Sequence, residues 1–186
     1  MQFNETKIPG CYEIIPRVLP DERGLFVKTF NRQQFAECGL ATDFAEGYYT
    51  LSRRGVLRGL HFQTPPLDHA KLVYCPAGEI FDAVLDLRSG SPTFGEVLTS
   101  TLSERTANML YLPPGLAHGF WTTSDKALVM YQVTSRYAPE HDAGILWSSA
   151  GIPWPGGTPV LSARDRSFPR LDEFVSPFVF AGNVTP

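Results

Sequence analysis

Apolar and polar residues alternate with a period of two along several short stretches of the chain. In the segment 80–87 the odd positions are apolar and two even positions are aspartates, namely Phe81, Ala83, Leu85 and Leu87 against Asp82 and Asp86. In the segment 127–137 the odd positions after the first would share one face, and these are Val129, Tyr131, Val133, Ser135 and Tyr137. Such alternation predicts β-strands, because successive side chains of a strand point to opposite faces.

Turn-forming residues separate many such runs. The chain contains 16 glycines and 16 prolines between short runs rich in Val, Leu, Phe, Tyr and Thr, a pattern typical of many strands joined by turns. We therefore predict an all-β fold. The clearest helix candidate is the segment 31–39, where Asn31 can cap the start and Gly39 can end it, so that helix is expected to be short and peripheral.

The length of the chain, 186 residues, fits a single domain with its own core, and we expect one domain over residues 1–186. The segment that follows Trp154 is rich in turn-forming residues, so residues 155–186 are expected to form a turn-rich tail. Asp165 would then reach any site from a loop or a short helix.

Composition and charge narrow the class of protein. Hydrophobic residues make up 43% and charged residues 19%, and the formal net charge of -3 provides no basic field for a nucleic-acid partner. The start of the chain lacks a secretory signal pattern and no apolar run is long enough to span a bilayer, which predicts a cytoplasmic protein without a membrane partner. The three cysteines form no CxxC pair, so neither a disulfide framework nor a zinc site is predicted; they are Cys11, Cys38 and Cys75.

Two histidine-bearing stretches are candidates for chemistry. In "GVLRGLHFQTPPLDHAKLVY" (55–74), His61 and Lys71 lie in strand-like segments on either side of a proline-rich turn. In "LPPGLAHGF" (112–120), the spacing of Pro113, Gly115 and His118 fits the P-x-G-x-x-H element of the cupin superfamily. A hydrogen-bonded core histidine and a catalytic histidine are equally good interpretations of His118.

A bound metal is not expected. Metal cupins place a second histidine two residues after the first, and here that position is Gln63. Imidazole-bound metals need three or four convergent ligands, and the positive charge of Lys71 would repel a cation. Of the remaining histidines, His69 is expected in a solvated turn and His141 in a loop.

Five motifs together make the chain resemble a known family. They are "GVLRGLHFQ", "KLVYCPAGEIFDAVLDLRSGSPTFG", "LPPGLAHGF", "YQVTSRYAPEHDAGILW" and "PVLSARD". Their order and spacing are similar to those of the dTDP-4-dehydrorhamnose 3,5-epimerase family, a non-metal branch of the cupins. The resemblance implies a cupin-type jelly roll with short peripheral helices and a homodimer that exchanges residues 1–30. It also implies a nucleotide-linked 4-keto-6-deoxy sugar as substrate and no cofactor.

The resemblance assigns catalytic roles to four residues. It implies that His61 is the base and Asp165 its paired carboxylate, that Lys71 lies near the substrate carbonyl, and that Tyr131 is the acid on the opposite face. These residue types suit the chemistry, because a proton next to a ketone is removed only by a positioned base, with the enolate stabilised by a nearby charge. Inversion further requires that a proton return from the other face.

Substrate binding is implied for a second group. These residues are Arg23, Phe26, Lys28, Glu46, Tyr48, Arg58, Gln63, His118, Tyr137 and Asp142. Arg23 and Arg58 match arginines that hold the nucleotide diphosphate and the sugar. In a regular strand Arg58 and His61 would point to opposite faces, so we expect Gly59 to mark a bulge that re-aims one of them.

Departures from the family pattern cluster where substrate recognition is expected. Lys28 stands where a glutamate is usual, Asp142 shortens a usual glutamate, and Gln132 replaces a usual lysine. The segment containing Glu46, Tyr48 and Tyr49 replaces one that commonly reads Gln-Asp-Asn-His. The reaction class is therefore better determined than the substrate. The nucleotide can be dTDP, CDP or GDP, and the inverted centre can be C3, C5 or both. A mono-epimerase of a CDP- or GDP-linked sugar, a metal-dependent cupin and a non-catalytic sugar-binding cupin are the alternatives.

Overall fold

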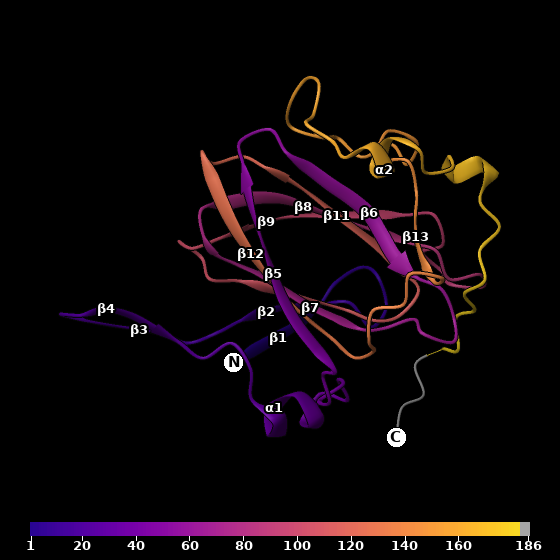
Figure 1. Ribbon diagram of the computed structural model, residues 1–186. Helices are drawn as coiled ribbons and strands as arrows, with labels where there is room; N and C mark the ends of the chain where they lie inside the picture. Colours follow the sequence, from indigo (N-terminus) through magenta and orange to yellow (C-terminus); the bar gives the residue numbers. More distant parts are fainter. Residues whose placement is uncertain (183–186) are drawn as a thin grey trace.

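The computed structural model describes residues 1–182, so residues 183–186 of the predicted tail lie outside the described part of the chain. Two antiparallel sheets pack face to face, and a separate two-stranded hairpin projects from one side (Figure 1). The helices are short and peripheral. The predicted all-β, cupin-type jelly roll with short peripheral helices is confirmed.

The larger sheet has six strands in the order β1-β2-β10-β7-β12-β5. Every neighbouring pair in it is antiparallel, and β5 lies at one edge. The strands are β1 (Gln2–Glu5), β2 (Tyr12–Ile15), β5 (Glu46–Arg53), β7 (Lys71–Ala77), β10 (Met109–Leu112) and β12 (Lys126–Val133).

The smaller sheet has five strands in the order β13-β6-β11-β8-β9. It faces the larger sheet across the interior of the sandwich, where fourteen buried apolar side chains, including those of Val73, Val84, Phe120 and Val129, form one cluster. The strands are β6 (Leu57–Gln63), β8 (Glu79–Asp86), β9 (Val97–Ser103), β11 (Leu116–Thr122) and β13 (Asp142–Gly144).

Strand β8 is buried on both faces. Its even positions Ile80 and Val84 belong to the cluster between the sheets, so Asp82 and Asp86 also point into the interior, and both are 0% exposed. Its odd positions, among them Leu85, pack into a second cluster on the outer face of the five-stranded sheet. The polar side of this alternating segment is therefore an inner wall of the sandwich.

The C-terminal segment covers that outer face (Figure 1). Ile152 and Phe178 are buried there against the odd-numbered side chains of β8. Up to residue 182, this segment contains one short α-helix and one 3-10 helix, which are α2 (Ala163–Arg166) and η1 (Leu171–Glu173). As predicted, Asp165 lies in a short helix, and the packing of the tail fixes that helix against the five-stranded sheet.

The predicted helix near residue 31 is confirmed as α1 (Arg32–Glu37). Asn31 caps it by accepting a hydrogen bond from the backbone N–H of Gln34, and Gly39 adopts a φ of 69° just beyond its end. Phe35 is completely buried against the outer face of the six-stranded sheet. Among residues 1–182, no helix is long and apolar enough to cross a membrane.

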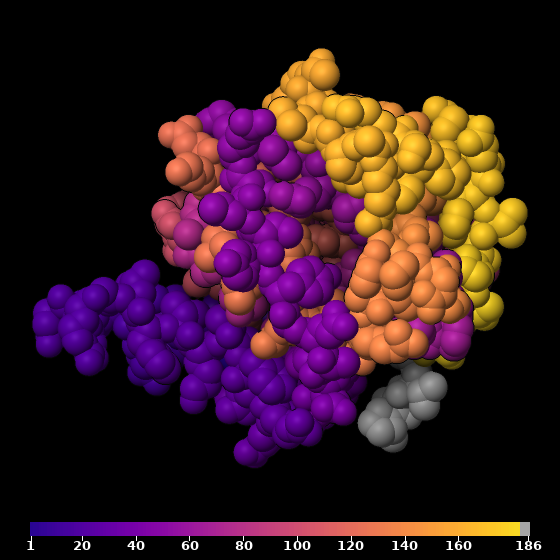
Figure 2. Space-filling view, in the orientation of Figure 1, coloured from indigo at the N-terminus to yellow at the C-terminus, as the bar shows by residue number. Residues whose placement is uncertain are grey.

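The hairpin of β3 (Val18–Asp21) and β4 (Gly24–Val27) extends away from the sandwich (Figures 1 and 2). Its apolar side chains are poorly covered, since Leu25 is 66% and Phe26 59% exposed. Large apolar groups on a projecting element are typical of a surface that meets a partner.

Candidate active site

Four strand ends surround a cavity of about 320 Å³, which we call the main cavity. β5 begins there with Glu46, β6 ends with Gln63, β7 begins with Lys71 and β12 ends with Val133. Antiparallel pairing brings these ends together, because Val133 lies opposite both Glu46 and Lys71. Figure 2 shows the surface hollowed between the purple atoms of β5 and the orange and yellow atoms of the C-terminal part. The lining residues are Glu46, Tyr48, His61, Phe62, Gln63, His69, Lys71, Val133, Tyr137, Asp142 and Arg164.

A smaller cavity of about 150 Å³, here called the inner cavity, shares three residues with the main cavity. The shared residues are Tyr48, His61 and Lys71. Side chains from both sheets line the inner cavity, and they are Tyr48, Thr50, Arg58, His61, Lys71, His118, Phe120 and Tyr131. Of the four predicted catalytic residues, His61, Lys71 and Tyr131 therefore line the inner cavity, and Asp165 does not.

The expected bulge at Gly59 is present. In the pairing of β6 with β11, His61 lies opposite His118 while Arg58 lies opposite Phe120, so β6 contains one extra residue. Gly59 has a φ of 135°, and a Cβ there would lie 2.5 Å from the Cα of Gly119, so only glycine fits. The bulge turns Arg58 and His61 toward the same cavity.

His61 and Asp165 form a close pair. His61 Nε2 lies 2.9 Å from Asp165 Oδ1, and Asp165 Oδ2 accepts a hydrogen bond from the backbone N–H of Gly59. Ser162 caps α2 by accepting a hydrogen bond from the N–H of Asp165, which fixes the carboxylate. A carboxylate only accepts hydrogen bonds, so Nε2 carries the proton and Nδ1 is the basic atom of His61.

Burial and hydrogen bonding set the charges of this pair. Burial lowers the pKa of His61 below 6.5, although the hydrogen bond that its Nε2 donates to Asp165 opposes that effect. Burial would raise the pKa of Asp165, but the hydrogen bonds that its carboxylate accepts from His61 and from the backbone N–H of Gly59 outweigh it and lower that pKa. At neutral pH the pair is therefore a neutral imidazole beside a carboxylate, which is the form a general base needs.

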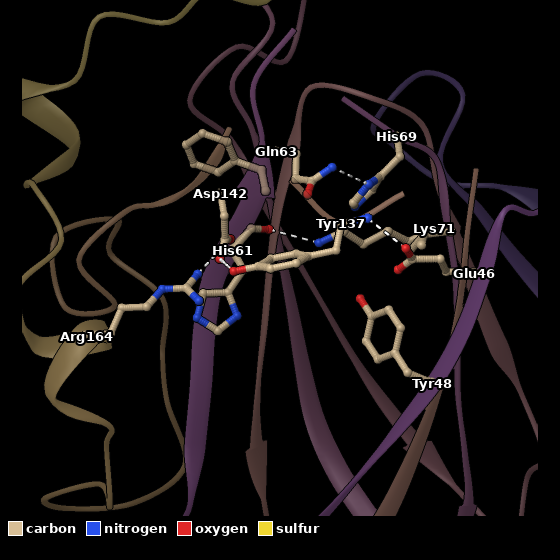
Figure 3. A pocket seen from close by; sticks show the side chains of 11 residues that line it. Glu46, Tyr48, His61, Gln63, His69, Lys71, Tyr137, Asp142 and Arg164 are labelled. Carbon is tan, nitrogen blue, oxygen red and sulfur yellow. Dashed lines mark hydrogen bonds and ion pairs between the residues drawn. The ribbon is translucent and has the colours of Figure 1, made fainter. Parts of the chain in front are cut away.

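Lys71 is buried between the two cavities. Its Nζ donates a hydrogen bond to the carbonyl oxygen of His61, at 3.1 Å (Figure 3). Burial lowers the pKa of Lys71 to about 8, against the opposing effect of the Asp142 and Asp82 carboxylates. Lys71 is thus mainly charged at pH 7, and it loses its charge as the pH rises past about 8.

Tyr131 lies on β12, in the sheet opposite His61, and is 6% exposed. Burial raises the pKa of its hydroxyl, so Tyr131 is protonated at neutral pH. Tyr48 lies directly opposite on β5, and the two rings stack. A protonated phenol and a neutral imidazole therefore line the inner cavity from two facing sheets.

His118 combines both interpretations suggested by the sequence. Its Nε2 lies 2.7 Å from Asp82 Oδ2, and the pair is buried, so His118 is a hydrogen-bonded core histidine. It also lines the inner cavity. The sequence did not identify Asp82 as its partner, because an aspartate in an alternating strand usually faces water.

A polar group closes the outer side of the main cavity (Figure 3). The Tyr137 hydroxyl donates to Asp142 Oδ2 at 3.1 Å, and Arg164 donates to Asp142 Oδ1 at 2.7 Å. Glu46 accepts a hydrogen bond from the backbone N–H of Tyr137, at 2.9 Å. The three predicted binding residues Glu46, Tyr137 and Asp142 are thus brought together, and Arg164, which the sequence analysis missed, joins them.

Arg164 also borders a groove outside the sandwich with Arg58, His61 and Asp165. Arg58 is held by a hydrogen bond from its Nε to Ser52 Oγ, at 3.0 Å. Two guanidinium groups therefore flank the His61 pair, an arrangement that suits a phosphate-bearing ligand. The position of Arg164 next to Asp165 in "PVLSARD" was the available signal for it.

Gln63 and His69 both line the main cavity. Gln63 lines the main cavity, but its amide nitrogen donates to the carbonyls of Leu67 and Arg136, and its amide oxygen accepts from the N–H of Ala138. This pattern favours support of the cavity wall over a contact with substrate. The prediction of a solvated His69 was wrong, because it is half-buried and burial lowers its pKa to about 3.

Three predicted binding residues do not reach either cavity within the single chain. Arg23 and Phe26 line a shallow depression on the projecting hairpin, where Arg23 forms an ion pair with Asp21, and Lys28 follows that hairpin. In the part of the chain that the structure describes, no group of three or more His, Cys, Asp or Glu residues could hold a metal ion.

Comparison with known proteins places these features in a family. The family model described as dTDP-4-dehydrorhamnose 3,5-epimerase matches residues 5–173. The dTDP-4-dehydrorhamnose 3,5-epimerase of Shigella flexneri is 40% identical over 181 residues, which cover 94% of this chain and 100% of that protein.

Solved structures share the fold closely. The chain matches dTDP-6-deoxy-D-glucose-3,5-epimerase RmlC from Legionella pneumophila, in complex with dTDP-4-keto-L-rhamnose, with a TM-score of 0.93 and 33% identity, over 97% of this chain and 99% of that one. It matches ChmJ, a 3'-monoepimerase from Streptomyces bikiniensis in complex with dTDP-quinovose, with a TM-score of 0.85 and 32% identity, over 90% and 86% of the chains. Epimerases that differ in the centres they invert therefore share this fold.

Proposed function

Because the chain belongs to the dTDP-4-dehydrorhamnose 3,5-epimerase family and is thus a sugar epimerase, we propose that it inverts C3, C5 or both centres of a nucleotide-linked 4-keto-6-deoxy sugar without a cofactor. One observation carries the proposal: His61 and Tyr131 stand on facing sheets and line the same inner cavity. A planar enolate held between them would meet a base on one face and an acid on the other.

The first step is removal of a proton by His61. The neutral imidazole takes the proton next to the ketone at Nδ1, and the electron pair of the broken C–H bond moves into the enolate. The carboxylate of Asp165, 2.9 Å from Nε2, balances the positive charge that forms on the ring. Lys71, fixed by its hydrogen bond to His61 O, supplies a positive charge for the enolate oxygen.

The second step is return of a proton by Tyr131. Its phenol gives a proton to the opposite face of the same carbon, which inverts the centre. Because burial keeps the phenol protonated, the acid is available at neutral pH. Repetition at the second carbon would give a 3,5-epimerase, and restriction to one carbon would give a mono-epimerase.

The groove that contains Arg58 and Arg164 is proposed to hold the diphosphate of the substrate. Both guanidinium groups flank His61 there, and each can bind phosphate oxygens through paired N–H groups. Tyr137, Glu46 and Asp142 at the outer side of the main cavity would contact the sugar or the nucleotide. The base of the nucleotide, dTDP, CDP or GDP, is the finer part of this proposal.

We also propose that the active form is a homodimer in which the β3–β4 hairpin enters the site of the partner. The hairpin projects from the sandwich and exposes Leu25 and Phe26. Exchange within residues 1–30 would carry Arg23, Phe26 and Lys28 to a site that they do not reach in their own chain. Cytoplasmic location and the absence of nucleic-acid and membrane partners stay predictions.

Solvent exchange tests the proposed reaction. The protein is incubated in deuterated water with dTDP-, CDP- and GDP-linked 4-keto-6-deoxy sugars, and deuterium at C3 and C5 is located by NMR. We expect deuterium at one or both centres together with inverted sugar. Binding of these sugars with no exchange at either centre would identify a sugar-binding cupin instead.

A further inference from the structure

The proposed reaction leaves its two proton-handling residues in the wrong state after each turnover. If inversion runs from His61 to Tyr131, His61 finishes with one additional proton and Tyr131 with one fewer. Tyr131 is 6% exposed, and an isolated buried phenolate is costly, so its proton must be replaced before the next turnover. This inference rests on the proposed function and concerns how the enzyme resets itself.

A second histidine–aspartate pair borders both of these residues. His118 lies directly opposite His61 in the pairing of β6 with β11, so the two side chains point to the same side of the sheet. The His118 ring also meets the Tyr131 ring edge-on, with 6.1 Å between the ring centroids. All three side chains line the inner cavity, which is large enough for a bridging water molecule.

The hydrogen bonds of His118 leave one ring nitrogen available. Its Nε2 donates to Asp82 Oδ2 at 2.7 Å, and within residues 1–182 its Nδ1 makes no hydrogen bond. Asp82 is 0% exposed, and its other oxygen, Oδ1, has no partner in the described part of the chain. A buried carboxylate so placed can balance the charge of an imidazolium, while Nδ1 can accept and donate a proton.

We propose that His118 and Asp82 return the proton from His61 to Tyr131. A water molecule in the inner cavity takes the proton that His61 gives up and passes a proton to Nδ1 of His118, which becomes an imidazolium beside the Asp82 carboxylate. The same nitrogen then gives that proton to the Tyr131 phenolate. One proton has moved, no other bond has changed, and both residues are ready for another turnover.

The test separates the first turnover from later ones. With dTDP-4-keto-6-deoxy-D-glucose in excess over the enzyme, the reaction is stopped at millisecond times with borohydride, which reduces the ketone and fixes each centre. In His118→Ala and Asp82→Asn we expect a burst of one inverted centre per active site, after which inversions are slower than that first one by about 10²-fold. Free imidazole should restore the later turnovers of His118→Ala, because it can fill the space that the side chain leaves.

His141→Asn is the matched control. His141 is hydrogen-bonded to Thr64 but lines neither cavity, so its variant should show no burst. A steady rate within a few-fold of the wild type in both relay variants would overturn the proposal. So would an equal loss of the first and later turnovers in Asp82→Asn at an unchanged melting temperature. A wild type that inverts none of the sugars would instead refute the proposed function itself.

Discussion

The ring of Tyr48 stacks on the ring of Tyr131, with 4.9 Å between their centroids and an angle of 19° between their planes. The two residues lie directly opposite each other on β5 and β12, so the contact follows from the pairing of these strands. Tyr48 also lines both cavities. It is therefore placed to hold the proposed acid in position and to shape the space for the sugar.

Removal of the Tyr48 ring should impair inversion. A stacked aromatic pair contributes about 0.5–1.5 kcal/mol beyond the area it buries, so we expect Tyr48→Ala to lower kcat about 10-fold. Tyr48→Phe keeps the stack and should stay within about 3-fold. Leu51→Ala, on the opposite face of β5 and exposed, is the control. Equal kcat values for Tyr48→Ala and Tyr48→Phe, measured by NMR, would show that the stack has no role.

The pH dependence of kcat/KM should be bell-shaped. His61 acts as a base only when neutral, and its pKa lies below 6.5, so activity should rise through that lowered pKa as the pH increases. Lys71 stabilises the enolate only when charged, and its pKa is about 8, so activity should fall as the pH passes that value. Lys71→Arg keeps its charge at all these pH values and should lose the falling limb. A falling limb that persists in Lys71→Arg would assign it to another group.

Mixed dimers can test the exchange of the hairpin. Arg23→Ala and His61→Asn should each be inactive as homodimers, but if Arg23 serves the site of the partner, a mixed dimer contains one intact site. Random exchange of subunits makes half of the dimers mixed, so about a quarter of the wild-type activity should return. Recovery of no activity after the subunits have demonstrably mixed would place Arg23 in its own chain's site or in none.

The sequence was informative where a local pattern determines the outcome. The period of two placed Tyr131 and Val129 on one face, and the glycine before His61 predicted the bulge, because both depend only on strand geometry. Asp82 was missed for a physical reason: alternation shows which residues share a face, but not which face is inside. Because the C-terminal segment covers the outer face of β8, the aspartate side of that strand is buried.

The misjudged surroundings of His69 have a similar origin. A histidine in a proline-rich turn is expected to be solvated, but this turn folds back on the loop after β12, and His69 Nδ1 lies 3.0 Å from Ser135 Oγ. The contact joins residues 66 positions apart, which no local pattern reports. The pairing of His61 with Asp165, 104 positions apart, was available only from the family motifs.

The sharpest test of the reaction removes one hydroxyl. Tyr131→Phe keeps the ring, its stack on Tyr48 and its burial, but it can no longer return a proton from the sheet that faces His61. His61 could still remove a proton and replace it on the same face. The variant should therefore incorporate solvent deuterium with retained configuration, while the rate of inversion falls by roughly 10²–10⁴-fold, the usual loss for a positioned acid.

His61→Asn is the matched control and should abolish exchange altogether, because enolate formation then lacks its base. Inversion by Tyr131→Phe within a few-fold of the wild type would show that another group, such as His118, delivers the proton, and Tyr131 would then be an aromatic wall of the inner cavity.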